Sequence, residues 1–190
     1  FTSSACVYGD TTAAKISEDF VICPNSQYGV GKFAAEEYCR LYFRKYGLPT
    51  VIFRQFNIYG KNQNCNFVIP NLIRRIKNNK ETKLLLYGSP ADARDFTNVK
   101  DLCKAFERAI EVCPAGETLN IGSGKEIKIF EVAKKIDKLL GKNTEFYYNN
   151  VILDGKILRL CADTEKTKRI LDWTPNIDIE QGLKELLADY

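Results

Sequence analysis

The chain has 190 residues, of which 45% are hydrophobic and 27% charged, and its net charge is +4. This length fits one domain or slightly more, with enough apolar residues to bury a core. The densest basic stretch, Arg74 to Lys80, reads as the solvated face of a helix end, which disfavours nucleic-acid binding. No apolar run approaches the length of a membrane span and no signal peptide is visible, so no membrane partner is expected.

Histidine is absent, which excludes Ser-His-Asp and Cys-His hydrolases and any His-ligated metal. The seven cysteines are scattered, odd in number and without a CxxC pair. This pattern disfavours a zinc site or a disulfide framework and fits reduced thiols in a cytoplasmic protein. No metal site is therefore expected.

Apolar periodicity and capping residues predict alternating strands and helices. The chain opens on residues typical of the end of a buried strand. Segment 57–60 is predicted to turn outward into a polar loop over 61–66. Helices are predicted at 27–45, 67–78, 99–112, 129–140, 164–171 and 179–187, and strands at 50–54, 83–87, 94–98, 118–121 and 145–148. This alternation predicts an α/β protein with a mostly parallel sheet.

Tyr28 and Lys32 lie four residues apart on the first predicted helix and therefore share one face. A hydroxyl cluster, Thr2-Ser3-Ser4, lies upstream. A free tyrosine titrates near pH 10, and a neighbouring cation favours its phenolate, while a hydroxyl donor can align a substrate oxygen. The trio indicates base catalysis by a phenol. Taken alone, the spacing more often indicates a core edge beside a solvated charge.

Six motifs in order resemble the C-terminal part of the extended short-chain dehydrogenase/reductase family, and most closely its NAD-dependent nucleotide-sugar epimerases and dehydratases. The motifs are Ser3-Ser4-Ala5-Cys6-Val7-Tyr8-Gly9, Tyr28-x-x-x-Lys32, Arg54-x-Phe56-Asn57-x-Tyr59-Gly60, Arg94-Asp95-Phe96-Thr97-Asn98-Val99-x-Asp101, Leu119-Asn120-Ile121-Gly122-Ser123-Gly124 and Leu171-Asp172-Trp173-Thr174-Pro175. The resemblance implies an α/β fold: the C-terminal part of a Rossmann-type doubly wound parallel sheet plus a small α/β substrate-binding lobe.

The resemblance also implies residue roles. Ser4 matches the catalytic Ser/Thr, Tyr28 the base, and Lys32 the residue that lowers the tyrosine pKa and binds the nicotinamide ribose, with Thr2 on the cofactor side. A nucleoside-diphosphate sugar is expected at a further set of residues, because a diphosphate favours a bidentate arginine. This set is Ser4, Asn57, Asn66, Phe67, Tyr87, Arg94, Phe96 and Arg159. Considered one at a time, these residues also have structural explanations. Arg94 fits a surface ion pair with Asp95 or Asp101, and Asn57 fits a residue that closes a turn.

Two departures from the family pattern bear on the reaction. Dehydratase relatives carry acidic residues just after the catalytic Ser/Thr, whereas Ala5 and Cys6 stand here. A neutral pair supplies no carboxyl proton, which disfavours 4,6-dehydration and favours the 4-epimerases. The second departure is the absence of the phosphate-binding arginine that many epimerases carry shortly before the position of Ala162-Asp163. Arg159 is the nearest arginine that could substitute for it. The preferred nucleotide of the substrate is therefore not determined.

The Gly-rich loop G-x-x-G-x-x-G of the family is absent, so the chain is expected to be a piece of a longer protein, inactive alone. Residues 1–60 are assigned to the dinucleotide-binding domain and 61–190 mainly to the substrate lobe, with 99–122 returning to the Rossmann sheet. The expected function is NAD-dependent epimerisation, with NADP left open. The rivals are an NADPH-dependent keto-sugar-nucleotide reductase and a truncated, non-catalytic ligand-binding relative. The family often dimerises through the Tyr28 helix; Phe33, Tyr38 and Tyr42 suit a homodimer or core packing equally.

Overall fold

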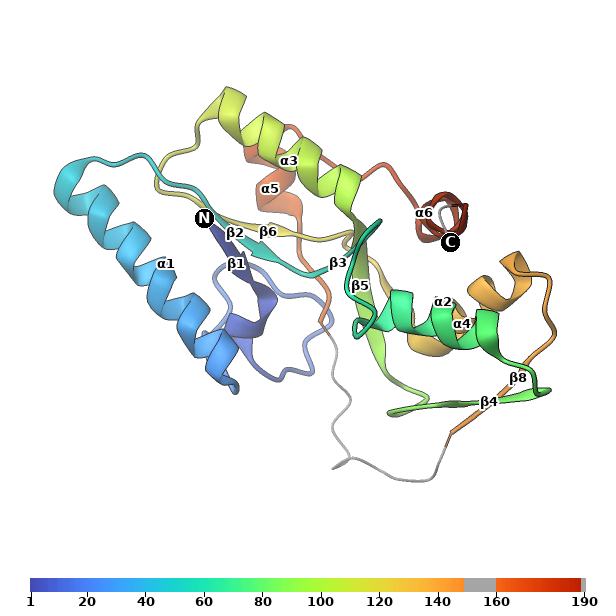
Figure 1. The fold of residues 1–190 in the computed structure, drawn as a ribbon. Helices are drawn as coiled ribbons and strands as arrows, with labels where there is room; N and C mark the ends of the chain where they lie inside the picture. Colours follow the sequence, from blue (N-terminus) through green and yellow to red (C-terminus); the bar gives the residue numbers. More distant parts are fainter. Residues whose placement is uncertain (149–159, 189–190) are drawn as a thin grey trace.

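The structure, a computed structural model, describes residues 1–148 and 160–188. Its first part is built on a three-stranded parallel sheet with the order β1-β2-β6. Helix α1 covers one face of this sheet, and α3 and α5 cover the other (Figure 1). The strands are β1 (Thr2–Ser4), β2 (Ile52–Gln55) and β6 (Thr118–Ile121), and the helices are α1 (Gln27–Tyr46), α3 (Val99–Val112) and α5 (Glu165–Leu171).

The second part holds the other strands and helices, and its apolar side chains form a separate core cluster. Strand β5 pairs in parallel with β3 and antiparallel with β7, while β4 pairs in parallel with β8. The strands are β3 (Asn57–Tyr59), β4 (Lys83–Leu86), β5 (Ala93–Asn98), β7 (Glu126–Lys128) and β8 (Glu145–Tyr148), and the helices are α2 (Val68–Asn78), α4 (Ile129–Leu139) and α6 (Ile179–Leu187).

The α/β class with mostly parallel strands is confirmed, and each predicted helix is present with ends that agree within one or two residues. The N-cap residues explain this agreement. Ser26 Oγ accepts a hydrogen bond from the backbone amide of Gly29, and Asn98 Oδ1 accepts one from the backbone amide of Lys100. Among the described helices, none combines the length and the apolar character needed to cross a membrane.

The prediction for residues 57–60 is wrong, because Asn57–Tyr59 forms β3 beside β5 instead of turning outward. The 3-10 helix η1 (Ala5–Tyr8) and the strand β7 were not predicted. Each of these elements has only three or four residues, too few to show a periodicity. The two strands exist because a distant strand, β5, offers hydrogen bonds on both of its edges.

Candidate active site

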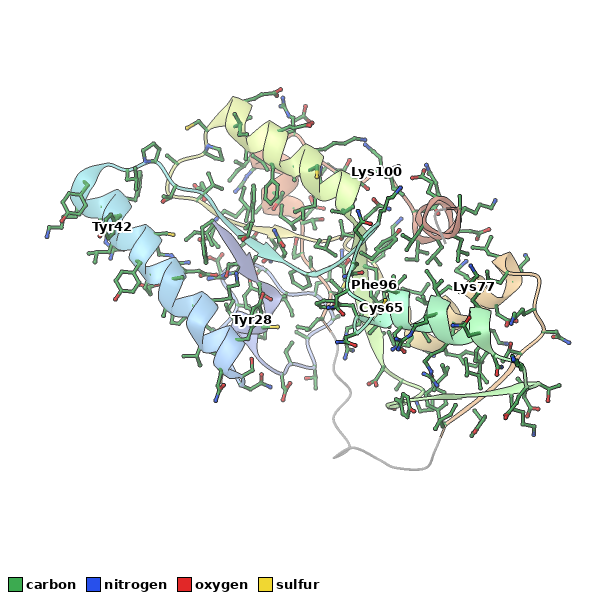
Figure 2. All side chains as sticks on the ribbon, viewed as in Figure 1. Tyr28, Tyr42, Cys65, Lys77, Phe96 and Lys100 are labelled. Carbon is green, nitrogen blue, oxygen red and sulfur yellow. The ribbon has the colours of Figure 1, made fainter. Side chains whose placement is uncertain are left out.

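Tyr28 and Lys32 occupy the first turns of α1, where the sequence places them on one face. The Lys32 ammonium lies 5.6 Å from the centroid of the Tyr28 ring and donates a hydrogen bond to the Thr2 carbonyl at 2.8 Å. Tyr28 is 57% exposed and projects from the end of α1 (Figure 2). The cation therefore lies beside the phenol and is tied to the strand that carries the hydroxyl cluster.

A cavity of about 590 Å³ lies at the carboxyl ends of β1 and β2, the edge at which open α/β sheets bind ligands. Ser4 and Tyr28 both line it, as do the predicted substrate residues Asn57, Phe67 and Phe96. Asn57 lies beside Phe96 in the β3–β5 register. The structure thus brings five of the predicted site residues to one cavity. Gln55, Cys6 and Gln63 also line it and were not predicted.

A second pocket, of about 500 Å³, is lined by the predicted residues Asn66, Tyr87 and Arg94. Val68 lines both cavities, so the two adjoin at the start of α2. Arg74 and Arg75 line the second pocket as well. Arg74 is exposed, as predicted for a solvated helix end, whereas Arg75 is partly buried because its guanidinium reaches strand β4.

The Arg75 guanidinium lies 4.8 Å from the centroid of the Tyr87 ring, within cation–π distance, and donates a hydrogen bond to the Leu85 carbonyl. Arg94 donates from Nη1 to the Ala93 carbonyl at 2.8 Å. Three arginines and an exposed aromatic ring therefore border one pocket. This combination suits an anionic ligand that carries a flat ring.

Three predicted residues do not line either cavity. Lys32 lies beside the Tyr28 ring and the Thr2 carbonyl. Thr2 is exposed on β1, and its recorded contact with Lys32 is through the backbone carbonyl. Arg159 lies outside the described residues. Over residues 1–148 and 160–188, no group of three or more cysteine and carboxylate side chains is arranged to hold a metal ion.

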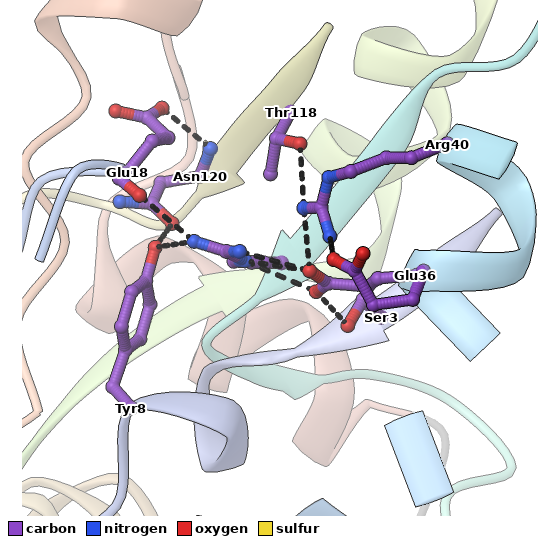
Figure 3. A network of polar contacts seen from close by, with 9 residues as sticks. Ser3, Tyr8, Glu18, Glu36, Arg40, Thr118 and Asn120 are labelled. Carbon is purple, nitrogen blue, oxygen red and sulfur yellow. Dashed lines mark hydrogen bonds and ion pairs between the residues drawn. The ribbon is translucent and has the colours of Figure 1, made fainter. Parts of the chain in front are cut away.

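Glu36 forms the centre of a buried polar network that joins α1 to the sheet (Figure 3). Its carboxylate accepts hydrogen bonds from Ser3 Oγ at 2.5 Å, Arg54 Nη2 at 2.8 Å and Arg40 Nη2 at 2.8 Å. Burial disfavours the ionised form, yet the hydrogen bonds from Arg54 and Ser3 and the nearby positive charge outweigh it, so the pKa of Glu36 is lowered. Glu36 is therefore ionised inside the protein.

Arg54 extends the network along the sheet toward Asn120 on β6. Its Nη1 donates to the Tyr8 hydroxyl at 3.0 Å and to the Glu18 carbonyl at 2.9 Å, and the Tyr8 hydroxyl donates to Asn120 Oδ1 at 2.7 Å. Burial raises the pKa of Tyr8 to about 12, so this phenol stays protonated. Since the network fixes Ser3, it also restrains Ser4, the next residue along β1.

The comparisons with known proteins agree with this geometry. The family model described as GDP-mannose 4,6 dehydratase matches residues 1–186. A Bacillus subtilis protein named as an uncharacterized UDP-glucose epimerase, YtcB, is 30% identical over 189 residues, which cover 99% of this chain and 58% of that protein. The chain therefore spans little more than half of this relative's length.

Two solved structures are similar throughout the chain. RMD from Pseudomonas aeruginosa, complexed with NADPH, has a TM-score of 0.91 and 28% identity, covering 99% of this chain and 64% of that one. UDP-glucuronic acid 4-epimerase from Bacillus cereus, in complex with UDP-glucuronic acid and NAD, has a TM-score of 0.87 and 29% identity, covering 100% of this chain and 59% of that one. This chain belongs to the same family, the nucleotide-sugar epimerases and dehydratases of the extended short-chain dehydrogenase/reductases.

Proposed function

We propose that the complete protein is an NAD-dependent epimerase that acts on a nucleoside-diphosphate sugar. The observation that carries this proposal is the meeting of Ser4 and Tyr28 in one cavity, with the Lys32 ammonium 5.6 Å from the Tyr28 ring. The chain spans 58% of the length of the Bacillus subtilis relative, and the proposal assigns the remaining cofactor contacts to the rest of the complete protein.

Each of the three groups has a distinct task in this proposal. Tyr28 removes the proton of the sugar hydroxyl at the reacting carbon, and Ser4 holds that oxygen by a hydrogen bond. Lys32 places a positive charge beside the Tyr28 ring, at 5.6 Å from its centroid. NAD, when bound, supplies the hydride acceptor and donor. The proposal also assigns to the cofactor Thr2 and Lys32, which are joined by the hydrogen bond from the Lys32 ammonium to the Thr2 carbonyl.

The second pocket supports a nucleoside diphosphate as the carrier of the sugar. Arg94, Arg74 and Arg75 provide permanent positive charge for the two phosphates, and the exposed ring of Tyr87 provides a face for the base. Asn66 borders this pocket, and Asn57, Phe67 and Phe96 border the cavity of the sugar. Arg159 stays a predicted contact.

The residues after Ser4 favour epimerisation over dehydration. Ala5 is buried in the core beneath η1, while Cys6 lines the cavity. Neither side chain offers a carboxyl group to protonate a leaving hydroxyl. An NADPH-dependent reductase of a keto-sugar nucleotide is the second candidate, and the solved structure with NADPH favours it. A non-catalytic ligand-binding relative is the third.

Substitution of Tyr28 by phenylalanine in the complete protein tests the proposal. Tyr28→Phe is expected to lower turnover of UDP-sugars about 100- to 10,000-fold, because only the hydroxyl that takes the proton is removed. Tyr38→Phe, at an exposed position of the same helix, is the matched control and is expected to retain activity. Near-normal turnover by Tyr28→Phe would remove the enzymatic proposal. Stoichiometric consumption of reduced nicotinamide, followed by its absorbance, would identify the reductase instead.

The proposal includes a homodimer formed through α1. Phe33 packs against the core beneath η1, whereas Tyr38 and Tyr42 are exposed, with 66% and 48% of their surfaces accessible. Core packing thus accounts for the first ring and not for the other two. Sedimentation velocity is expected to find a dimer of the complete protein and a monomer of Tyr38→Glu/Tyr42→Glu. A monomeric wild type would contradict this part of the proposal.

A further inference from the structure

At the ends of β1 and β2, two neighbouring residue pairs point to opposite faces of the sheet. Ser3 lies beside Arg54, and Ser4 lies beside Gln55. Successive side chains of a strand point to opposite faces of the sheet. Ser3 and Arg54 both reach Glu36, which defines the α1 face. Ser4 and Gln55 therefore form a neighbouring pair on the opposite face.

This second pair borders the cavity of about 590 Å³ together with Tyr28. Neighbouring strands lie about 4.8 Å apart, so a ligand atom that is bound at Ser4 lies within reach of the Gln55 carboxamide. Gln55 is the last residue of β2 and is partly exposed. Its position on a strand restrains its backbone more firmly than a loop does.

The Gln55 carboxamide is also available to a ligand. A glutamine amide offers two donors and an acceptor oxygen. Within residues 1–148 and 160–188, the Gln55 side chain makes no hydrogen bond. The other glutamine of the cavity, Gln63, differs in this respect, because its Nε2 donates to the Ile58 carbonyl at 2.8 Å. Gln63 therefore supports the loop, whereas Gln55 has its full hydrogen-bonding capacity open.

We propose that Gln55 is a further ligand-contacting residue. Its carboxamide hydrogen-bonds an uncharged oxygen of the sugar or of NAD, close to the carbon that reacts. The inference rests on the proposed function. A neutral amide suits a hydroxyl or carbonyl oxygen, unlike the arginines of the second pocket, which suit phosphates. Two groups have this chemistry: a hydroxyl of the sugar next to the reacting carbon, and the carboxamide of the nicotinamide ring.

Replacing Gln55 by leucine removes the hydrogen-bonding groups at nearly constant volume. In the complete protein, Gln55→Leu is expected to lower kcat/KM for the UDP-sugar that the wild type turns over by about 10- to 100-fold. If the partner is a sugar hydroxyl, the dissociation constant of NAD, measured by calorimetry, stays unchanged. If the partner is the nicotinamide carboxamide, NAD binding weakens by a similar factor. Either result supports the proposal.

Two controls keep the proposal open to refutation. Gln181→Leu makes the same chemical change at an exposed position of α6 and is expected to alter neither quantity. Gln55→Asn, which withdraws the amide by one methylene, replaces the leucine variant if that variant does not fold, with a loss expected in the same quantity. A folded Gln55 variant within twofold of wild type in both quantities, beside an inactive Tyr28→Phe, overturns this inference and leaves the proposed function standing. An active Tyr28→Phe overturns the proposed function itself.

Discussion

At the scale of single residues, Glu36 shows how the protein fixes its candidate site without contacting a ligand. It lies one helical turn beyond Lys32, fully buried, and binds side chains of β1 and β2 at once. A buried carboxylate that faces an equally buried guanidinium is costly to leave unpaired. The ion pair with Arg54 therefore restrains α1 against β2, and the hydrogen bond from Ser3 restrains it against β1, the strand that carries Ser4.

Glu36→Gln is expected to lower the free energy of unfolding by about 3 kcal/mol at pH 7, because it leaves the Arg54 cation buried without a counter-charge. The pKa of Glu36 is lowered in the folded protein, so its stabilising charge is fully present above its ordinary pKa of 4.5 and is lost as the pH falls through the lower folded value. The difference between wild type and variant should therefore shrink below about pH 4.5. Urea unfolding from pH 7 downward measures it.

Two features make this measurement specific. The pKa values of Glu18 and Asp95 are raised by burial, but both groups titrate in wild type and variant alike and cancel in the difference. Glu37→Gln is the matched control, since Glu37 pairs with Arg40 at a half-exposed position and should change stability by no more than about 0.5 kcal/mol. A Glu36→Gln penalty that stays constant with pH would contradict the charge argument.

The sequence predicts residue partners well only where they are close along the chain. The spacing of four that joins Tyr28 to Lys32 is such a case. Glu36 and Arg54 lie 18 residues apart on different elements, and a charged residue on a helix gives no sign of its partner. Gln55 was missed for the same reason, because its place beside Ser4 depends on the pairing of β1 with β2.

At the scale of elements, the start of α1 is held against η1 by a close approach at Gly29. A Cβ atom at this position would lie 2.6 Å from the Cys6 carbonyl oxygen and 3.0 Å from the Pro24 side chain. Gly31, two residues further along the same helix, has no atom within 4 Å of the corresponding point. The two glycines therefore form a matched pair within one helix.

Gly29→Ala is expected to lower the free energy of unfolding by about 1–3 kcal/mol, because α1 or η1 must move to admit the methyl group. The same movement displaces Tyr28, the preceding residue, so activity of the complete protein should fall as well. Gly31→Ala is expected to raise stability by about 0.5–1 kcal/mol, because alanine favours a helix over glycine. Thermal unfolding of both variants decides the matter; equal effects of the two would contradict the packing argument.

The longer helices and strands were predicted more closely than the shorter ones. Long helices such as α1 and α3 carry periodicity and caps within their own sequence, and their bounds were predicted closely. The strands β3 and β7 carry neither, and both depend on β5. The division of the chain at residue 60, with 99–122 returning to the first sheet, stays a prediction.

At the scale of the whole molecule, the chain holds both proposed substrate cavities but few proposed cofactor contacts. The two cavities are lined by residues 3 to 129, all within the described part of the chain. On the cofactor side, the proposal names Thr2, Tyr28 and Lys32, and the 190 residues contain no G-x-x-G-x-x-G loop to receive a pyrophosphate at a helix start. Strand β1 pairs with β2 alone among the described strands, which leaves its other edge open.

A chain of these 190 residues, prepared by itself, is therefore expected to bind NAD with a dissociation constant weaker than about 1 mM, since contacts at the ribose end alone cannot replace those to the pyrophosphate. Calorimetric titration measures this, with circular dichroism to establish that the helices of the sample are formed. The complete protein, titrated under the same conditions, is expected to bind in the micromolar range. Micromolar binding of NAD by the 190-residue chain would show that it carries a cofactor site of its own, and the assignment of that site to the rest of the complete protein would then be wrong.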